Sequence, residues 1–200
     1  MNPYLAAIEC GPWERRGNRY EAPWDSRAAK SAYPAAARLE RHYRRRRYSY
    51  AIPNAQAIAA LCDLSPLIEV GAGTGYWASV VQERGGDILP FDDGSWYCRP
   101  RFWPRWTTVF QGGASVVARY PGRTLFLCWP PSDDSMATDS LRLYTGRTFI
   151  YVGEGGGGCT GDDEFHAMLE RDWTLAREIM IPQWHGINDI MAVYERNGAA

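Results

Sequence analysis

Hydrophobic and polar positions change period along the middle of the chain. Residues 67–70 (LIEV) form a short apolar run that leads into a glycine-rich turn. Residues 76–85 (YWASVVQERG) then follow helical spacing, and residues 87–91 (DILPF) form a second short apolar run. Short apolar runs bounded by turn residues indicate strands, and the segment between them indicates a helix. This part of the sequence therefore predicts a βαβ unit.

The flanking segments predict further elements of both kinds. Before the unit, helices are expected at 35–47 and 54–64, with Pro53 at the start of the second. After it, residues 162–173 (DDEFHAMLERDW) predict another helix. Additional strands are expected at 107–110, 124–129 and 148–152, and a Trp-rich irregular loop is expected between Phe91 and Pro104.

The last part of the chain carries two β-prone runs, 175–184 and 189–197, joined by residues 185–188. They predict a C-terminal antiparallel hairpin. Alternating βα units closed by such a hairpin imply an α/β sandwich of three layers around a mostly parallel sheet, with one reversed strand near its edge. Residues 1–47 are expected to form an N-terminal arm and a basic helix, and residues 48–200 the main domain.

Composition narrows the class of protein. The chain has 200 residues, of which 46% are hydrophobic, and this suits a single globular domain. No apolar run approaches the roughly 20 residues that cross a bilayer, and the first residues lack the order of a secretory signal. We therefore expect a cytoplasmic protein without a membrane partner. The five cysteines include no CxxC pair, so reduced thiols and no metal site are predicted.

Basic residues are concentrated near the start, although the net charge is only −1. They centre on 41–48 (RHYRRRRY), which can bind phosphates through Arg and stack bases on Tyr43 or Tyr48. A charge run of this kind also forms a solvated or acid-pairing helix face. Because Lys30 is the only lysine, the run also reflects a general preference for Arg. Nucleic acid is thus considered as a partner but not favoured.

The glycine-rich turn after residues 67–70 suggests a ligand loop. Gly71, Gly73 and Gly75 stand between a strand and a helix, where glycine permits sharp turns and close approach to a ligand. A purely structural connection is the alternative. No GK[ST] follows, which excludes a P-loop, and Tyr76 occupies the last position of a GxGxxG fingerprint begun at Gly71. The frame GxGxxA begun at Gly73 places the tight turn inside the predicted helix, so it is discounted.

This segment resembles the first motif of the class I S-adenosylmethionine-dependent methyltransferases, an acidic residue on the first strand followed by GxGxG. The residues concerned are Glu69, Gly71, Ala72, Gly73, Thr74 and Gly75. The resemblance extends over about residues 48–197. It implies a Rossmann-like fold, S-adenosylmethionine as the cofactor, and a role for Glu69 near the methionine end, through its own hydrogen bonds or by fixing the glycine loop.

The resemblance also implies an acidic residue at the end of the second strand that accepts hydrogen bonds from the ribose hydroxyls. Asp92 stands there, with Asp93 beside it. A carboxylate suits a diol and a cationic ligand, although a turn acid is the alternative interpretation. After the third strand, where many relatives hold an acid against adenine, this chain has residues 110–113 (FQGG). Adenine recognition is then expected from backbone groups or other side chains.

The end of the fourth strand carries residues 127–134 (LCWPPSDD). This stretch partly resembles the Asx-Pro-Pro-aromatic signature of methyltransferases that act on amino groups in nucleic acids or glutamine. Trp129 replaces the Asx and Ser132 replaces the aromatic residue, so that specificity is not transferred to this chain. Trp129 and Pro130 are kept as candidates for substrate binding, because ligands bind outside the carboxyl ends of such strands.

Methyl transfer depends on alignment of the acceptor with the sulfonium, so few catalytic residues are needed. The candidates by placement are Asp133, with Asp134 beside it, Glu154 and His185. Their structural alternatives are a loop acid, a cap in the glycine-rich run 153–161, and a turn residue against Trp184. The run 153–161 is expected to form a lid at the rim of the site.

These features together predict a methyltransferase that acts on a small-molecule substrate. Two alternatives stay open. One is a relative that keeps the cofactor pocket for another reaction or for regulation, which the altered motifs after the third and fourth strands allow. The other is a nucleic-acid-binding protein that uses the basic segment.

Overall fold

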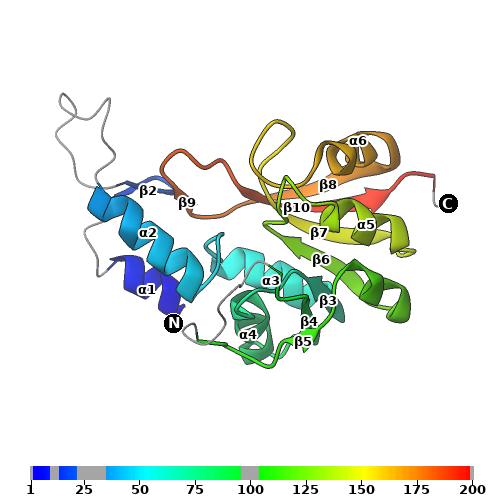
Figure 1. Ribbon diagram of the computed structural model, residues 1–200, viewed down its shortest axis with the longest axis horizontal. Helices are drawn as coiled ribbons and strands as arrows, with labels where there is room; N and C mark the ends of the chain where they lie inside the picture. Colours follow the sequence, from blue (N-terminus) through cyan, green and yellow to red (C-terminus); the bar gives the residue numbers. More distant parts are fainter. Residues whose placement is uncertain (1, 10–13, 22–34, 96–103, 199–200) are drawn as a thin grey trace.

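The computed structural model describes residues 2–9, 14–21, 35–95 and 104–198. Its centre is a seven-stranded sheet in the order β5-β4-β3-β6-β7-β10-β8 (Figure 1). The strands of this sheet are β3 (Leu67–Val70), β4 (Ile88–Asp92), β5 (Phe110–Gln111), β6 (Thr124–Cys128), β7 (Thr148–Gly153), β8 (Trp173–Met180) and β10 (Ile190–Arg196). The βαβ unit predicted from residues 67–91 is present.

The sheet is mostly parallel. Strands β3 to β7 pair in parallel with one another, whereas β10 is antiparallel to both of its neighbours, β7 and β8. Strands β8 and β10 form the C-terminal antiparallel hairpin that the sequence predicts. The reversed strand lies one position from the sheet edge, which confirms the expected mixed sheet.

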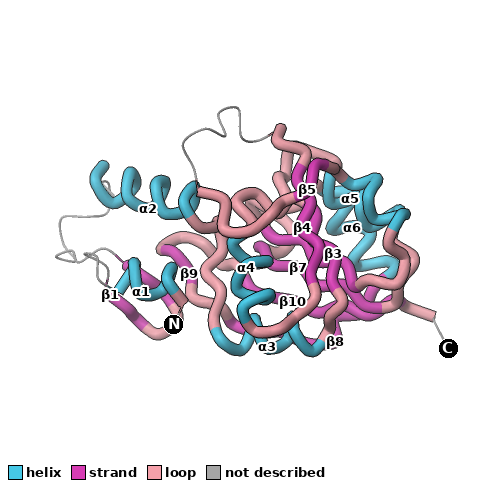
Figure 2. The backbone as a smooth tube through the Cα atoms, turned by 90° about the horizontal axis from the view of Figure 1, so that it is seen from below, coloured by secondary structure: helices cyan, strands magenta, loops and turns pink. Residues whose placement is uncertain are grey.

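Helices cover both faces of the sheet (Figure 2). Helices α3 (Ala55–Asp63) and α4 (Tyr76–Glu83) pack on one face; η2 (Ala114–Arg119), α5 (Met136–Leu143) and α6 (Asp163–Asp172) pack on the other. Successive strand residues point to opposite faces, so Phe126 joins the first core while Leu125 and Leu127 join the second. Because both faces are covered at the centre of the sheet, strands β6 and β7 are largely apolar along their length. The protein therefore has a Rossmann-like, three-layer α/β fold.

The N-terminal segment contains more regular structure than the arm expected from the sequence. It forms α1 (Pro3–Glu9), β1 (Glu14–Arg16), β2 (Arg19–Glu21) and α2 (Ala35–Arg47). Strand β2 pairs in parallel with β9 (Gln183–Trp184), which creates a second, three-stranded sheet. The side chains of Tyr4, Ile8 and Tyr20 are buried in the same core as Trp184. A domain boundary between residues 47 and 48 stays a prediction.

Several element boundaries differ from the prediction, for identifiable reasons. The strand expected at 107–110 is shorter and later than predicted, and only β5 forms. The backbone N–H of Trp106 donates to Thr74 O at 2.9 Å, so the start of this segment pairs with the glycine loop instead of the sheet. The run 175–184 is divided, because β8 ends at Met180 and Gln183 donates its backbone N–H to Asn18 O at 2.7 Å. Helix α5 and the 3₁₀ helix η2 were not predicted.

Among the residues that the structure describes, no helix is both long and apolar enough to cross a bilayer.

Candidate functional site

A cavity of about 390 Å³ lies at the carboxyl ends of the parallel strands. Strand β3 is followed along the chain by β4 on one side, whereas β6 is followed by β7 on the other, so β3 and β6 flank the point where the strand order reverses. Open α/β sheets bind ligands in the crevice at such a point. The cavity is lined by residues from the ends of both strands, including Gly71 and Cys128.

All but three of the predicted site residues line this cavity. Those that do are Glu69, Gly71, Ala72, Gly73, Thr74, Asp92, Asp93, Trp129, Pro130 and Asp133. Gly75, Glu154 and His185 are not among the lining residues. The structure therefore brings the glycine loop, the two acids at the end of β4 and the segment after β6 to one place, although they are far apart in the sequence.

Asp92 ties the ends of β3 and β4 together. Its Oδ2 accepts the backbone N–H of Gly73 at 2.8 Å, and its Oδ1 accepts that of Gly94 at 2.8 Å. Each carboxylate oxygen has further lone pairs, so the group can accept additional hydrogen bonds from a ligand. Gly73 has φ 55°, in the left-handed region that favours glycine. The loop and the carboxylate therefore hold each other in position.

Glu69 lies in the cavity lining but is almost fully buried, with 1% of its surface exposed. Its Oε2 has no hydrogen-bond partner among the described residues. Burial raises the pKa of this carboxyl well above its ordinary value, and the charge of Asp92 adds to the rise. A buried polar atom without a partner is costly, so the position fits a ligand that supplies a hydrogen-bond donor or a positive charge.

Gly75 serves packing instead of lining the cavity. It precedes α4 with φ 74°. A Cβ at this position would stand 2.7 Å from Cγ2 of Val109 and 3.0 Å from Cγ2 of Thr107. Glycine therefore allows the loop to contact the segment before β5. The cofactor contact that the resemblance implies for Gly75 stays a prediction.

Four aromatic residues line the cavity: Tyr48 and Tyr50, which follow α2, Trp77 in α4, and Trp129, which follows β6. The rings of Tyr50 and Trp129 stack with centroids 5.1 Å apart. From the sequence, Tyr48 is expected only as a base-stacking residue, and nothing marks Tyr50 or Trp77 as part of a site. No local pattern could have revealed them, because their place depends on contacts between distant segments.

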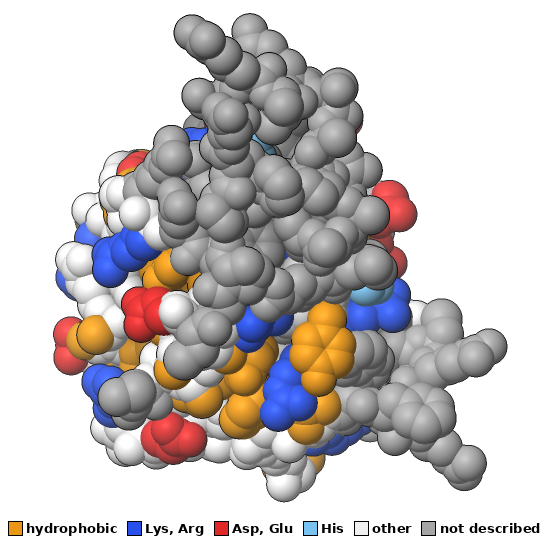
Figure 3. Space-filling view, turned by 90° about the vertical axis from the view of Figure 1, so that its left-hand side faces the viewer, with side chains coloured by type: hydrophobic (Ala, Val, Ile, Leu, Met, Phe, Trp, Pro, Cys, Tyr) orange, Lys and Arg blue, Asp and Glu red, His pale blue; other side chains and the backbone are white. Residues whose placement is uncertain are grey.

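The arginine run at the end of α2 contacts this aromatic lining. The guanidinium carbon of Arg45 lies 4.8 Å from the centroid of the Tyr50 ring, and that of Arg47 lies 5.7 Å from the Tyr48 ring. Figure 3 shows basic and hydrophobic side chains side by side at this end of the molecule. Part of the predicted basic segment therefore supports the cavity wall.

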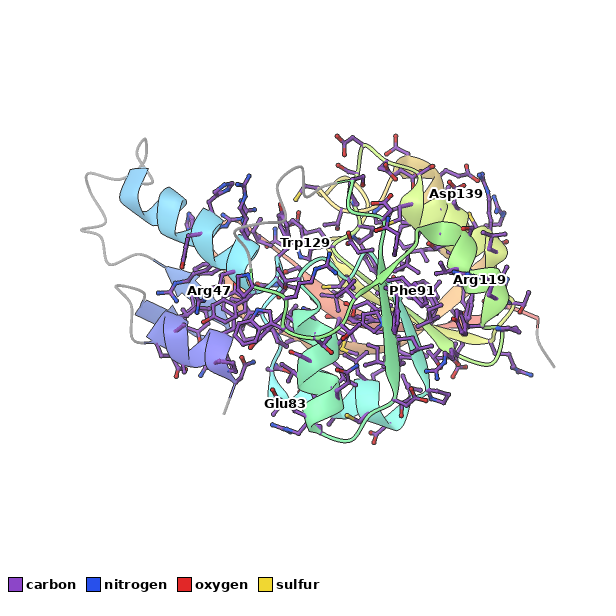
Figure 4. The ribbon with its side chains drawn as sticks, turned by 60° about the horizontal axis from the view of Figure 1, so that its bottom comes forward. Arg47, Glu83, Phe91, Arg119, Trp129 and Asp139 are labelled. Carbon is purple, nitrogen blue, oxygen red and sulfur yellow. The ribbon has the colours of Figure 1, made fainter. Side chains whose placement is uncertain are left out.

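Trp129 has an unusual backbone conformation. Its φ is 55°, and among the described residues it is the non-glycine residue with positive φ. Left-handed backbone costs a bulky residue about 1–2 kcal/mol. Its backbone N–H donates to Val152 O at 2.8 Å, and its indole Nε1–H donates to Oδ2 of Asp189 at 2.8 Å. In Figure 4 the residue lies between Arg47 at the end of α2 and Phe91 in β4.

The two acids after β6 lie at the rim of the cavity and are exposed. Oδ1 of Asp134 accepts the backbone N–H of Met136 at 2.8 Å, so Asp134 helps to begin α5. Asp133 lines the cavity beside it. A catalytic role for Asp133 stays a prediction.

Glu154 connects two loops. Its Oε2 accepts the backbone N–H of Cys159 at 3.1 Å and the thiol at 3.0 Å, while its Oε1 accepts the backbone N–H of Asn188 at 2.8 Å. Burial alone would raise the pKa of Glu154, but these hydrogen bonds outweigh burial and lower it. The structure thus gives Glu154 a structural role outside the cavity lining, and its catalytic role stays a prediction.

The glycine-rich run reaches the cavity through Cys159, which is a lining residue. Burial and the hydrogen bond to Glu154 raise the pKa of the Cys159 thiol to about 11, so it is protonated at neutral pH. His185 is exposed and outside the lining, and its backbone O accepts a hydrogen bond from Arg41 at 3.4 Å. The lid function of this run and a catalytic role for His185 stay predictions.

The cavity lining also includes residues to which the sequence assigns no role. Gly112 and Gly113 line the cavity near Asp93. They belong to the segment after the third strand, where adenine recognition by backbone groups is expected. Cys128 is half-buried at the end of β6. Burial, with the nearby charges of Glu69 and Asp189, raises the pKa of its thiol well above the ordinary value. These residues have no recognisable motif of their own.

Comparison with known proteins found no matching protein-family model and no matching curated protein. Among solved structures, a protein in the NADB-Rossmann superfamily from Streptococcus agalactiae has a TM-score of 0.47 and 11% identity, covering 73% of this chain and 70% of that one. The structure described as PigF with SAH has a TM-score of 0.42 and 15% identity, covering 96% and 81%. Likeness at this level gives no information on ligand or reaction.

Proposed function

We propose that this chain binds S-adenosylmethionine in the cavity and transfers its methyl group to a small-molecule acceptor. The observation that supports this most directly is the arrangement of Asp92, Gly73 and Glu69 at the point where the strand order reverses. Asp92 is bonded to the glycine loop, and the loop stands beside the unpartnered buried oxygen of Glu69. These residues match the motif whose resemblance implies this cofactor.

The donor set suits a ligand that is cationic and carries a diol. The Asp92 carboxylate can accept hydrogen bonds from two ribose hydroxyls in addition to its backbone donors. Glu69 would meet the methionine end, where a positive charge or an N–H donor would satisfy its buried oxygen. When bound, the cofactor supplies a methyl group that its sulfonium has already activated.

The segment after β6 would receive the acceptor. Trp129 and Pro130 line the cavity at the end of this strand, and Tyr50 stacks on Trp129. Aromatic and proline side chains exclude water and restrict the orientation of a bound molecule, which is the main requirement for aligned transfer. Asp133 at the rim would accept a proton only where the acceptor atom is acidic.

The dimensions of the cavity suit small-molecule ligands. A volume of about 390 Å³ lies within the range of small-molecule sites, about 300–1,000 Å³. Arg45 and Arg47 lie over tyrosine rings of the cavity wall. Because these two side chains pack on the tyrosine rings, one function of the basic segment is to support the cavity wall. This arrangement does not favour a continuous phosphate-binding face.

Calorimetry tests the proposed cofactor. We expect S-adenosylmethionine and S-adenosylhomocysteine to bind with about micromolar affinity, and NAD to give no heat. Asp92→Ala should weaken S-adenosylhomocysteine about tenfold or more, because hydrogen bonds to charged groups contribute about 1.5–3 kcal/mol each. Asp87→Ala is the matched control, since Asp87 precedes the other end of β4 and pairs with Arg123.

Heat with NAD but with neither sulfur ligand would contradict the proposal, as would equal losses in the two aspartate variants. Turnover is measured separately, as formation of S-adenosylhomocysteine in the presence of a small-molecule extract. Binding without turnover would favour the alternative of a non-methylating relative.

A further inference from the structure

We propose that Asp189 is a positioning residue, whose buried carboxylate fixes the indole of Trp129 as one wall of the cavity, and that this wall selects a planar aromatic acceptor. The inference rests on the proposed function, because it names the acceptor class for the same cavity. Asp189 is not itself a lining residue. It would act through Trp129, to which it is hydrogen-bonded.

The carboxylate of Asp189 is deeply buried, with 1% of the residue exposed. Its Oδ2 accepts the indole N–H of Trp129 at 2.8 Å, and its Oδ1 has no partner among the described residues. A hydrogen bond to a carboxylate is stronger than one between neutral groups, and its loss would leave the partly buried indole N–H without this acceptor. The indole nitrogen is therefore held at one point.

The segment that presents Asp189 is itself fixed. The amide Nε2 of Gln183 donates to the backbone O of Asp189 at 2.8 Å, in a buried position. The preceding residue, Asn188, donates its backbone N–H to Glu154 Oε1 at 2.8 Å. Glu154 follows β7, so the carboxylate of Asp189 is anchored to the central sheet as well as to β9.

Trp129 is restrained from its backbone and from its ring. Its φ of 55° turns the chain at the end of β6, and its backbone N–H donates to Val152 O in β7 at 2.8 Å. The Tyr50 ring stacks on the indole at an interplanar angle of 26°. A strained backbone persists where the surroundings over-determine it, and such strain gathers at functional sites. The orientation of the indole is thus set by three independent contacts.

A rigid aromatic wall is expected to bind flat aromatic rings more tightly than saturated rings. Trp129, Tyr50 and Tyr48 all contribute to the cavity lining, and Pro130 and Pro131 continue it. Flat rings recognise flat rings by offset or edge-to-face contact, and the fixed ring loses little entropy on binding. A saturated ring of the same size presents no π face. The wall therefore favours a planar aromatic acceptor over an aliphatic one.

Asp189 interacts electrostatically with several other groups, so the matched control must remove its charge and keep its hydrogen-bond acceptor. Burial raises the pKa of Asp189 to about 7; Trp129 lowers it, Glu154 raises it and Arg41 lowers it. Asp189 in turn raises the pKa of Cys128 and Tyr4. Asparagine keeps an oxygen that can accept the indole N–H without the charge, whereas leucine removes the acceptor.

The experiment uses the full chain and two probes that share a carbon skeleton and a hydroxyl, 2-naphthol and decahydro-2-naphthol. Only the first is flat. Their binding is measured by calorimetry, with and without S-adenosylhomocysteine, for the wild type, Asp189→Asn, Asp189→Leu, Trp129→Phe and Trp129→Ala. The indole N–H of Trp129 is followed by NMR of ¹⁵N-tryptophan-labelled protein and assigned by its absence in Trp129→Phe.

We expect the wild type to bind 2-naphthol about threefold to tenfold more tightly than its saturated counterpart, as one aromatic stacking contact provides. Asp189→Asn should retain this preference and the indole signal. Asp189→Leu should lose the preference and move the signal toward that of an exposed indole, while S-adenosylhomocysteine affinity stays within about twofold. A purely structural role would change the melting temperature and leave the preference intact.

Equal binding of the two naphthols by the wild type would overturn the proposal, as would an Asp189→Leu protein that keeps the preference after its indole signal has moved. Should Asp189→Leu not fold, Trp129→Ala decides: loss of the preference supports the aromatic wall and its retention overturns it. Failure of the wild type to bind S-adenosylhomocysteine contradicts the proposed function instead. The naphthol preference measured without that ligand still tests the present inference.

Discussion

Individual residues of the glycine loop have different physical roles. Gly73 has a left-handed backbone and donates its N–H to Asp92, within the cavity. Gly75 has a similar conformation but is required by its close contact with Val109. One glycine of the motif therefore allows close approach to a ligand, and another allows close packing. The sequence pattern alone does not show which glycine has which role.

Gly73→Ala tests the role of the loop, with Gly85→Ala as its control. Both glycines have positive φ, and a Cβ at Gly85 would meet no atom within 4 Å. Alanine should therefore cost each variant about 1–2 kcal/mol of stability from the left-handed backbone. Only Gly73→Ala should also weaken S-adenosylhomocysteine, by about tenfold. Calorimetry and thermal unfolding measure the two effects, and equal affinity in both variants would place the ligand elsewhere.

Asp92 and Asp189 illustrate which acids can be found from sequence. Asp92 directly follows the short apolar run 87–91 in the sequence, so its place at the carboxyl end of β4 could be predicted from periodicity alone. Asp189 follows an irregular segment, and its partner Trp129 is 60 residues away in the sequence. Its importance comes from a tertiary hydrogen bond and from burial, neither of which leaves a local pattern.

At the scale of elements, the central strands were predictable because both of their faces are buried. Strands β6 and β7 are largely apolar, and β3 is interrupted only by Glu69, which is itself buried. Helix α5 was missed because its sequence, MATDSLRL, contains residues that favour caps and turns over helix interiors. Strand β9 was missed as a separate element because it pairs with β2, far away in the chain.

Glu154→Gln tests the connection between the glycine-rich loop and the segment before β10. The amide keeps one acceptor oxygen, so the hydrogen bond either to Cys159 or to Asn188 should be lost, at about 1–2 kcal/mol. Hydrogen exchange should quicken in residues 155–159 and 187–189. Because folding lowers the pKa of Glu154, its ionised carboxylate contributes to folding stability above the ordinary pKa of 4.5. This contribution to stability is lost as the pH falls through the lowered pKa.

The alternative for Glu154 is catalysis. Reduced turnover with unchanged hydrogen exchange in both segments would support a catalytic role and contradict the structural one. Asp163→Asn is a suitable control, because Asp163 is exposed at the start of α6 and is not a lining residue.

At the scale of the whole molecule, the cavity is assembled from segments that lie far apart in the sequence, from Tyr48 to Cys159. The N-terminal segment packs into the core beside Trp184, and the residues after α2 form part of the cavity wall. The sequence predicted the three-layer sandwich, because alternating elements determine it. It could not predict that the basic helix would end at the cavity, since that depends on the packing of Tyr48 against Tyr4 and Trp106.

A crystal structure of the protein with S-adenosylhomocysteine would show directly whether the cavity holds the cofactor. We expect the ligand between the ends of β3 and β6, with its ribose hydroxyls within hydrogen-bonding distance of Asp92 and its amino-acid end toward Glu69. The backbone of Gly73 should lie against the ligand. A ligand bound away from this cavity, or one whose ribose does not contact Asp92, would rule out the proposed cofactor site.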